Sequence, residues 1–240
     1  ECIKNNITGA ENIVRASIRC GVKKIIALST DKAVNPINLY GASKLVSDKV
    51  FIAGNNLSGG REIRFSVVRY GNVINSRGSV VPLFNKMIAD GSRYLPVTDE
   101  RMTRFWLTLE QGVSFVLSSL RQMNGAEIFI PKIPTIKIKD LAEAMAPQLD
   151  KKIIGIRPGE KLHEEMITES DSLNTIDLGE YYAILPSVSY TYTAEEYMKH
   201  HKAEMVPFGF TYNSGTNTEW ETIDSLRELI KEHVDPQFSV

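Results

Sequence analysis

The sequence predicts an α/β fold in which helices cover a parallel β-sheet. Two short apolar segments rich in β-branched residues, 23–29 and 64–70, have the pattern of buried strands. Between them lies a predicted helix that carries Tyr40 and Lys44 and continues to Phe51. A strand, a helix and a second strand without polar alternation are typical of a parallel sheet whose two faces are both covered.

The rest of the chain has weaker but readable patterns. The first helix is expected to run to about Cys20 and to end at Gly21, the usual place for a glycine cap. After Tyr70 the sequence becomes polar and rich in glycine, as in a binding loop at the carboxyl end of a strand. Further expected elements are loops at 55–60 and 208–215, helices at 81–90, 109–123, 138–149, 193–201 and 219–233, strands at 127–131, 153–156 and 181–185, and a strand-like alternation of Tyr190 and Tyr192.

Composition excludes several classes of function. The 240 residues are 42% hydrophobic and 24% charged, as in an ordinary globular protein with a sizeable core. A net charge of -1 gives no general attraction to nucleic acid or to a membrane surface, and no apolar run is long enough to span a bilayer. The two cysteines, Cys2 and Cys20, carry no motif, which favours a reducing, cytoplasmic setting over a disulfide framework.

The most informative stretch is 29–44, which follows the first predicted strand. Tyr40 and Lys44 lie four residues apart on the predicted helix, so they share a face. An ammonium group stabilises a neighbouring phenolate, which makes a tyrosine usable as a general base or acid. Asp31 and Lys32 add a second acid/base pair at the end of the strand. The alternative is a solvated surface ion pair, but their placement at the carboxyl end of the strand argues against it. The stretch therefore predicts an enzyme in which four titratable groups converge on a small substrate.

The order of residues in this stretch, Ser-Thr-Asp-Lys-Ala-x-Asn-Pro-x-Asn-x-Tyr-Gly-Ala-Ser-Lys, resembles the extended short-chain dehydrogenase/reductase superfamily. More narrowly, it resembles the inverting UDP-N-acetylglucosamine 4,6-dehydratases, which begin pseudaminic acid biosynthesis. The resemblance covers the chain to about residue 170 and includes segments 69–73, 76–82, 102–106 and 157–161. The membrane-anchored retaining dehydratases typically have Met where this chain has Tyr40, so the resemblance favours the inverting branch.

The resemblance implies a fold: the carboxyl half of a Rossmann-type parallel sheet with a smaller substrate-binding part. Residues 1–75 would form the C-terminal half of an NADP-binding Rossmann domain, and 76–240 mainly a substrate-binding region, with segments near 127–150 returning to the sheet. Members of the family open with a Gly-rich strand-turn-helix that binds the cofactor pyrophosphate, and the sequence contains no such fingerprint. With a first residue already in helical rhythm, this predicts a piece of a longer protein that lacks dehydratase activity alone.

The resemblance also implies roles for the residues of the stretch. Tyr40, with Lys44 beside it, would take the C4 hydroxyl proton of the sugar as hydride passes to NADP. Lys32 is the candidate base for the C5 proton, and Asp31 is the candidate acid that expels the C6 hydroxyl as water. Thr30 would hydrogen-bond the sugar O4. Hydride would then return to C6, and reprotonation of C5 from the opposite face would invert that centre.

Further residues are candidate ligand contacts by the same resemblance. Candidate contacts of NADP are Asn6, Tyr40, Lys44 and Val73. Candidate contacts of the UDP-sugar are Lys32, Asn72, Arg77, Gly78, Ser79, Val80, Val81, Pro82, Arg104, Arg157 and Glu160. Arginine suits a diphosphate because its planar fork donates two parallel hydrogen bonds. No metal site is expected, because His163, Glu164 and Glu165 have incomplete ligand spacing and a solvated helix start is the simpler explanation.

Two alternatives stay open. A nucleotide-sugar 4-epimerase of the same superfamily returns hydride to C4 and needs no Asp-Lys pair for dehydration. Asp31 and Lys32 therefore discriminate between a dehydratase and an epimerase. A non-catalytic nucleotide-sugar-binding protein would keep its function when Tyr40 is replaced by Phe. The expected partners are UDP-N-acetylglucosamine and further copies of the chain, since members of the family form homo-oligomers. Neither nucleic acid nor a membrane is expected as a partner.

Overall fold

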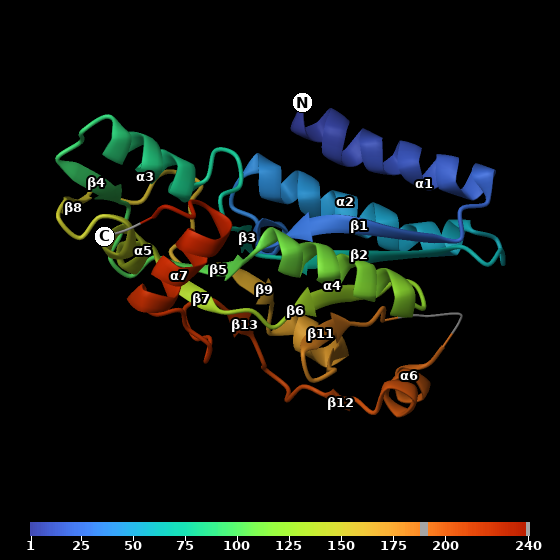
Figure 1. Cartoon of the computed structure of the whole chain (residues 1–240). Coiled ribbons are helices and arrows are strands. Elements are labelled where there is room, and N and C mark those ends of the chain that lie inside the picture. Colours follow the sequence, from blue (N-terminus) through green and yellow to red (C-terminus); the bar gives the residue numbers. More distant parts are fainter. Residues whose placement is uncertain (188–191, 239–240) are drawn as a thin grey trace. The chain divides into compact units, whose positions relative to one another are not determined.

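The computed structural model describes residues 1–187 and 192–238, so Tyr190 lies outside the described residues (Figure 1). The chain divides into two compact units. The first unit comprises 1–70, 113–132 and 165–212, and the second comprises 71–112, 133–164 and 213–240. The chain thus alternates between the two units along its length. None of the described helices is long and apolar enough to cross a membrane.

The first unit is built on a six-stranded sheet in the order β1-β2-β6-β11-β10-β12. These strands are β1 (Lys24–Thr30), β2 (Arg64–Tyr70), β6 (Ile128–Pro131), β11 (Tyr181–Ile184), β10 (Thr175–Asp177) and β12 (Glu204–Met205). β1, β2 and β6 run parallel, with Ser29 opposite Arg69 and Val68 opposite Phe129, whereas β11 is antiparallel to β6. The predicted α/β class with parallel strands is therefore confirmed.

The prediction that the first strand is buried is wrong. Among the described residues, β1 pairs with β2 alone and forms an edge of the sheet. Most of its side chains are half-exposed, and Leu28 is 49% exposed, whereas the interior of β2 is fully buried. A run of β-branched residues specifies a strand but does not specify whether that strand is central or at an edge.

Helices cover both faces of the parallel strands (Figure 1). α1 (Gly9–Cys20) and α2 (Leu39–Leu57) lie on one face, where Phe65 of β2 packs beneath Gly54. α4 (Leu109–Gln122), which belongs to this unit from Val113 onward, packs against the other face, around Val68. Successive side chains of a strand point to opposite faces of the sheet, so β2 can pack against α2 with Phe65 and against α4 with Val68.

The helix ends follow local chemistry. α1 follows a π-helical segment η1 (Ile3–Thr8) and ends at Gly21, whose φ is +68°, as predicted. α2 extends to Leu57, past the predicted start of a loop at 55, because the Asn55 amide exchanges hydrogen bonds with the backbone of Phe65 at 2.8 and 3.0 Å. The other elements of this unit are η2 (Asp31–Ala33), β9 (Glu165–Ile167), η3 (Ser170–Asn174) and α6 (Ala194–His201).

The second unit packs helices on two small sheets. Its helices are α3 (Val80–Ala89), α5 (Ile138–Met145) and α7 (Ile223–His233). One sheet contains β3 (Asn72–Val73), β5 (Thr103–Leu107) and β7 (Thr135–Lys137), and the other pairs β4 (Tyr94–Val97) with β8 (Asp150–Ile153). β13 (Tyr212–Asn213) begins at the end of the first unit. The fully buried Phe84, Leu95, Ile136 and Leu141 form part of the core of this unit.

Several boundaries in the second unit differ from the predictions. The helix expected over 138–149 ends at Met145, and the strand expected at 153–156 occupies 150–153, where it pairs with β4. The helix expected from 219 begins at Ile223, because the Thr222 hydroxyl accepts from the backbone N–H of Ser225 and caps it. Strand pairing and helix capping set the ends of these elements, and neither can be inferred from apolar periodicity.

Glu127 is a fully buried carboxylate directly before β6. Its oxygens accept from Ser66 Oγ at 2.6 Å and from the backbone N–H groups of Asn124 and Gly125 at 2.6 and 2.8 Å. We predict that Glu127→Ala lowers the free energy of unfolding by about 3 kcal/mol, because three donors lose their acceptor. Urea unfolding measures this loss. Glu62→Ala, an exposed residue just before β2, should change it by under about 0.5 kcal/mol, and equal losses would contradict the prediction.

The first turn of α2 lies directly against the η2 turn at Gly41. A Cβ at this position would overlap the carbonyl oxygen of Lys32 and lie 3.0 Å from Pro36 Cβ. We predict that Gly41→Ala destabilises the protein by about 1–3 kcal/mol through overpacking, as measured by urea unfolding. The matched control is Gly112→Ala in α4, where the new Cβ would lie at an ordinary 3.6 Å from Leu107. It should be neutral or stabilise by up to about 1 kcal/mol; a Gly41 variant as stable as this control would refute the close contact.

Candidate active site

The loop between β1 and α2 brings the two predicted acid/base pairs to neighbouring turns. β1 ends at Thr30, and Asp31 and Lys32 follow in η2. Asn38 caps α2, since its Oδ1 accepts from the backbone N–H of Gly41 at 2.8 Å. The close approach at Gly41 then holds the first turn of the helix against the turn that carries the Asp-Lys pair.

Asp31 is fully buried, and its two carboxylate oxygens differ in their hydrogen bonds. Its Oδ1 accepts from Thr30 Oγ1 at 2.7 Å and from Lys32 Nζ at 2.9 Å. Its Oδ2 is buried and has no hydrogen-bond partner within 1–187 and 192–238. The Lys32 side chain keeps 34% of its surface exposed. A solvated surface ion pair therefore does not describe this site, because the carboxylate side of the pair is shielded from water.

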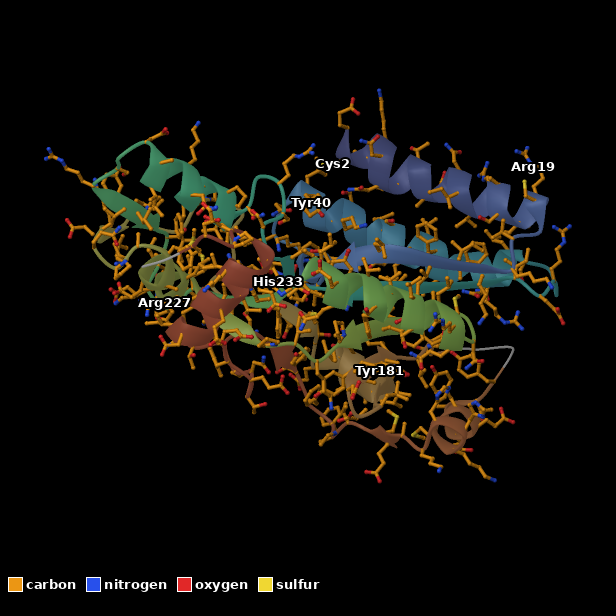
Figure 2. All side chains as sticks on the ribbon, viewed as in Figure 1. Cys2, Arg19, Tyr40, Tyr181, Arg227 and His233 are labelled. Atoms are coloured by element: carbon orange, nitrogen blue, oxygen red, sulfur yellow. The ribbon has the colours of Figure 1, made fainter. Side chains whose placement is uncertain are left out.

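Tyr40 and Lys44 occupy consecutive turns of α2, and Tyr40 is 44% exposed near the start of the helix (Figure 2). Lys44 Nζ donates to the carbonyl oxygen of Leu28 at 2.7 Å, which fixes the ammonium on β1. Burial lowers the pKa of Lys44, and the Asp48 carboxylate one turn further opposes that change. Burial, and then proximity to Tyr40, raise the pKa of Tyr70 at the end of β2. The helix thus presents an accessible phenol beside an anchored ammonium.

Asn6, a predicted cofactor contact, lies against the same helix. Its Nδ2 donates to Ser43 Oγ at 2.9 Å, and that hydroxyl donates to the carbonyl oxygen of Tyr40 at 2.8 Å. Asn6 and Lys44 both line a hollow of about 300 Å³ along β1, together with Leu28. An amide, an ammonium and an apolar strand surface fit the hydroxyls of a ribose and the flat ring of a nicotinamide.

The predicted ligand contacts at 72–82 belong to the second unit. Asn72 and Val73 form β3 and pair with Trp106 and Leu107 of β5. Arg77 is exposed, and Gly78 has φ +78°, which favours glycine. The segment leads into α3, whose first residues are Val80, Val81 and Pro82. Val81 is fully buried in the core, whereas the N-cap residue Ser79 has a buried Oγ without a partner among the described residues.

The two predicted phosphate-binding arginines have different surroundings. Arg104 is 8% exposed and donates to the carbonyl oxygens of Thr103 and Leu162 at 2.6 and 3.2 Å. Its guanidinium therefore already joins β5 to a neighbouring segment. The Arg157 side chain is 61% exposed, and its Nε lies 3.5 Å from Glu160 Oε1. Arg157 can reach a ligand without giving up a buried hydrogen bond.

The prediction of a solvated helix start at 163–165 is wrong. No helix begins there, and Glu164 is only 3% exposed. His163 Nδ1 hydrogen-bonds Thr103 Oγ1 at 2.7 Å, and that hydroxyl also bonds Ser214 Oγ at 2.7 Å. Burial, followed by the positive charge of Arg104, lowers the pKa of His163. Within the described part of the chain, no group of three or more His, Cys, Asp or Glu side chains could hold a metal ion.

Sequence reasoning missed Asp48, a buried residue whose Oδ2 accepts from Ser29 Oγ at 2.8 Å. Its position four residues after Lys44 resembles an ordinary exposed ion pair on a helix. The signal that could have found it is the placement of Ser29 and Arg69, two polar residues near the ends of neighbouring apolar strands.

Comparisons with known proteins found a matching family and similar relatives. A family model described as polysaccharide biosynthesis protein matches residues 1–186. The chain is 56% identical over 233 residues to the inverting UDP-N-acetylglucosamine 4,6-dehydratase of Campylobacter jejuni subsp. jejuni serotype O:23/36 (strain 81-176), which covers 96% of this chain and 70% of that protein. It is 40% identical over 188 residues to the UDP-glucose 4-epimerase of Rickettsia canadensis (strain McKiel), covering 77% and 55% of the two chains.

Among solved structures, the X-ray structure of Pen from Bacillus thuringiensis is similar to this chain with a TM-score of 0.82. The two share 33% sequence identity, and the match covers 95% of this chain and 68% of that one. The family model, the identity to a curated relative and the shared fold lead to one conclusion. This chain belongs to the polysaccharide biosynthesis protein family and, within it, to the group of the inverting UDP-N-acetylglucosamine 4,6-dehydratases.

Proposed function

We propose that this protein dehydrates UDP-N-acetylglucosamine across C5 and C6 with inversion at C5, giving UDP-2-acetamido-2,6-dideoxy-β-L-arabino-hex-4-ulose. The observation that carries the proposal is the pair formed by the buried Asp31 carboxylate and Lys32, held directly against the helix turn that presents Tyr40. Redox chemistry at C4 needs a base such as Tyr40, and elimination of water needs a second acid and base. The 56% identity to a relative with this activity in its name supports the same reading.

Tyr40 is the proposed base for the C4 hydroxyl. Its phenol is accessible, and Lys44 brings a positive charge to the next turn of the same helix. The bond from Lys44 to the Leu28 carbonyl keeps that charge in place during the reaction. Thr30 is proposed to bond the sugar O4, at the end of the strand that leads into the Asp-Lys pair.

Asp31 and Lys32 are the proposed acid and base of the elimination. A lysine base must be neutral and an aspartic acid must carry a proton, so the ion pair must first exchange a proton. The 2.9 Å separation of Lys32 Nζ from Asp31 Oδ1 allows that transfer directly. Lys32 then takes the C5 proton, and Asp31 protonates the departing C6 hydroxyl.

We propose NADP as the cofactor. When bound, it supplies the hydride acceptor for C4 and the hydride donor for C6. In the first unit, Asn6, Tyr40 and Lys44 would hold it, since Asn6 and Lys44 line one hollow along β1. In the second unit, Val73 is the proposed contact.

The proposed contacts of the UDP-sugar, apart from Lys32, lie on the second unit. Arg157 is the best-supported of these contacts, because its exposed guanidinium is available for the diphosphate. Glu160 beside it could accept a hydrogen bond from a ribose hydroxyl. Arg104 would act mainly by holding the 162–164 segment, given its bonds to backbone carbonyls. The other proposed contacts are Asn72, Arg77, Gly78, Ser79, Val80, Val81 and Pro82.

We further propose a homo-oligomer in a reducing, cytoplasmic compartment. Leu39, Val46 and Leu57 are 62%, 41% and 65% exposed, and their spacing places them on one face of α2. Such an apolar stripe favours contact with a further copy of the chain. Both cysteines, Cys2 and Cys20, are free thiols, which supports a compartment without disulfide formation.

A 4-epimerase is the second candidate function, favoured by the 40% identity to the epimerase of Rickettsia canadensis. An epimerase product has the mass of its substrate, whereas dehydration removes one water. Mass spectrometry of the product formed from UDP-N-acetylglucosamine by the protein expressed from its complete gene separates the two. A product that retains the full mass and differs only at C4 would replace the proposed dehydratase by an epimerase.

We predict that Asp31→Asn and Lys32→Met each lower kcat for water loss by about 10²- to 10³-fold, because each removes a proton-transfer group. KM should change by less than about threefold for Asp31→Asn, since the buried carboxylate is proposed to act in the elimination itself. Steady-state kinetics of the protein expressed from its complete gene, with NADP and UDP-N-acetylglucosamine, provide the measurement. Lys49→Met, an exposed lysine on the same helix as Tyr40, is the control and should keep wild-type kinetics. Wild-type rates in both Asp31 and Lys32 variants would rule out their proposed roles.

A further inference from the structure

Asp48 connects the proposed catalytic helix to two strands of the sheet. It lies one turn beyond Lys44 on α2 and is only 1% exposed. Its Oδ2 accepts from Ser29 Oγ at 2.8 Å and lies 3.7 Å from Arg69 Nη2. Ser29 and Arg69 are directly opposite each other in the parallel β1-β2 ladder. A single carboxylate therefore joins α2 to the carboxyl ends of both strands.

The ion pair partner is itself held in place. Arg69 is 4% exposed, and its Nη1 donates to the carbonyl oxygen of Met166 in β9 at 2.8 Å. Buried charges are costly unless they are paired and hydrogen-bonded, and a well-packed apolar pair is often as stable. Stability alone is therefore a weak explanation for an Asp-Arg pair at this place, and its position next to the proposed chemistry suggests a different role.

The residue of β1 that bonds Asp48 directly follows the residue that holds Lys44. Lys44 donates to the carbonyl oxygen of Leu28, and the next residue along β1 is Ser29, which bonds Asp48. Asp31, the proposed acid, lies two residues further along the chain. We propose that Asp48 is a positioning residue: its buried carboxylate holds the part of α2 that carries Lys44 against the end of β1, through Ser29 and Arg69. This inference rests on the proposed function.

The charges around Asp48 have a consequence for Lys44. Burial raises the pKa of Asp48, whereas Arg69 from β2, the Ser29 hydroxyl from β1 and Lys44 from α2 lower it. In return, burial lowers the pKa of Lys44 and the Asp48 carboxylate raises it. Neutralising Asp48 removes a charge that favours the Lys44 ammonium, so Lys44 should lose its proton at a lower pH.

The test compares Asp48→Asn with wild type in the protein expressed from its complete gene. We expect kcat for dehydration to fall about tenfold or more with KM within about threefold, because an uncharged amide loses the ion pair with Arg69 and holds α2 against β1 less firmly. The alkaline limb of the kcat profile should move down by about one pH unit, as Lys44 deprotonates earlier. An unchanged alkaline limb, or a rate loss that matches only the loss of folded protein, would overturn the proposal.

Two further variants keep this test decisive. Glu127→Gln changes another buried carboxylate of the same unit and should reduce stability without moving the alkaline limb. Ser29→Ala removes one hydrogen bond to Asp48 and leaves its charge, so it should lower kcat in the same direction by a smaller factor, even if Asp48→Asn folds poorly. Wild-type kcat in Ser29→Ala, or a limb shift of equal size in Glu127→Gln, would count against the proposal.

A readout without turnover separates this inference from the proposed function. In protein labelled with ¹³C at lysine Cε, the resonance lost in Lys44→Met identifies Lys44, and its titration gives the pKa directly. We expect that pKa to be lower in Asp48→Asn than in wild type. If UDP-N-acetylglucosamine is not dehydrated but the shift is found, the proposed function fails and the Asp48-Lys44 coupling stands. If dehydration occurs and the Lys44 titration is identical in both proteins, the coupling fails and the proposed function stands.

Discussion

The structure of the first unit depends on how closely α2 can approach the ends of β1 and β2. Two contacts set that approach. At Gly41 the absence of a Cβ lets the first helical turn touch the backbone of Lys32, and at Asp48 a carboxylate is bonded to the sheet. The contact at Gly41 sets the distance of α2 from the η2 turn. The contact at Asp48 also constrains the orientation of α2, because hydrogen bonds to carboxylates require alignment. Lys44 lies between the two fixed points, so its place is determined by both.

The buried carboxylates of this unit differ in how completely they are satisfied. Glu127 has three donors shared between its two oxygens, and Asp48 has a serine and an arginine. Asp31 has two donors on one oxygen and, among the described residues, none on the other. A carboxylate with a purely structural role is expected to have hydrogen bonds to both oxygens. A buried oxygen without a hydrogen-bond partner lowers the stability of the fold, so a structural role alone does not explain it. The contrast supports chemistry at Asp31 and a supporting role at Glu127.

Local pattern was sufficient to predict the elements around the site, and long-range contacts explain what it missed. The apolar segment 64–70 and the spacing of Tyr40 and Lys44 correctly indicated a buried strand and a shared helix face. The exposure of β1 depends on its strand neighbours, which the segment itself does not encode. Likewise, the bend at His163 depends on Thr103, sixty residues earlier in the sequence. Each of these errors concerns a residue whose partner lies far away along the chain.

The same limit applies to reading arginines as phosphate ligands. Arg104 and Arg157 are chemically identical, and each stands in a motif that resembles the same family. In the structure, the guanidinium of Arg104 is satisfied by backbone carbonyls, whereas that of Arg157 is mostly exposed beside a single carboxylate. Moving Arg104 onto a ligand would break buried hydrogen bonds at a cost of about 1–3 kcal/mol for each acceptor left unpaired. Arg157 meets no such cost, so burial rather than residue type ranks it as the better diphosphate ligand.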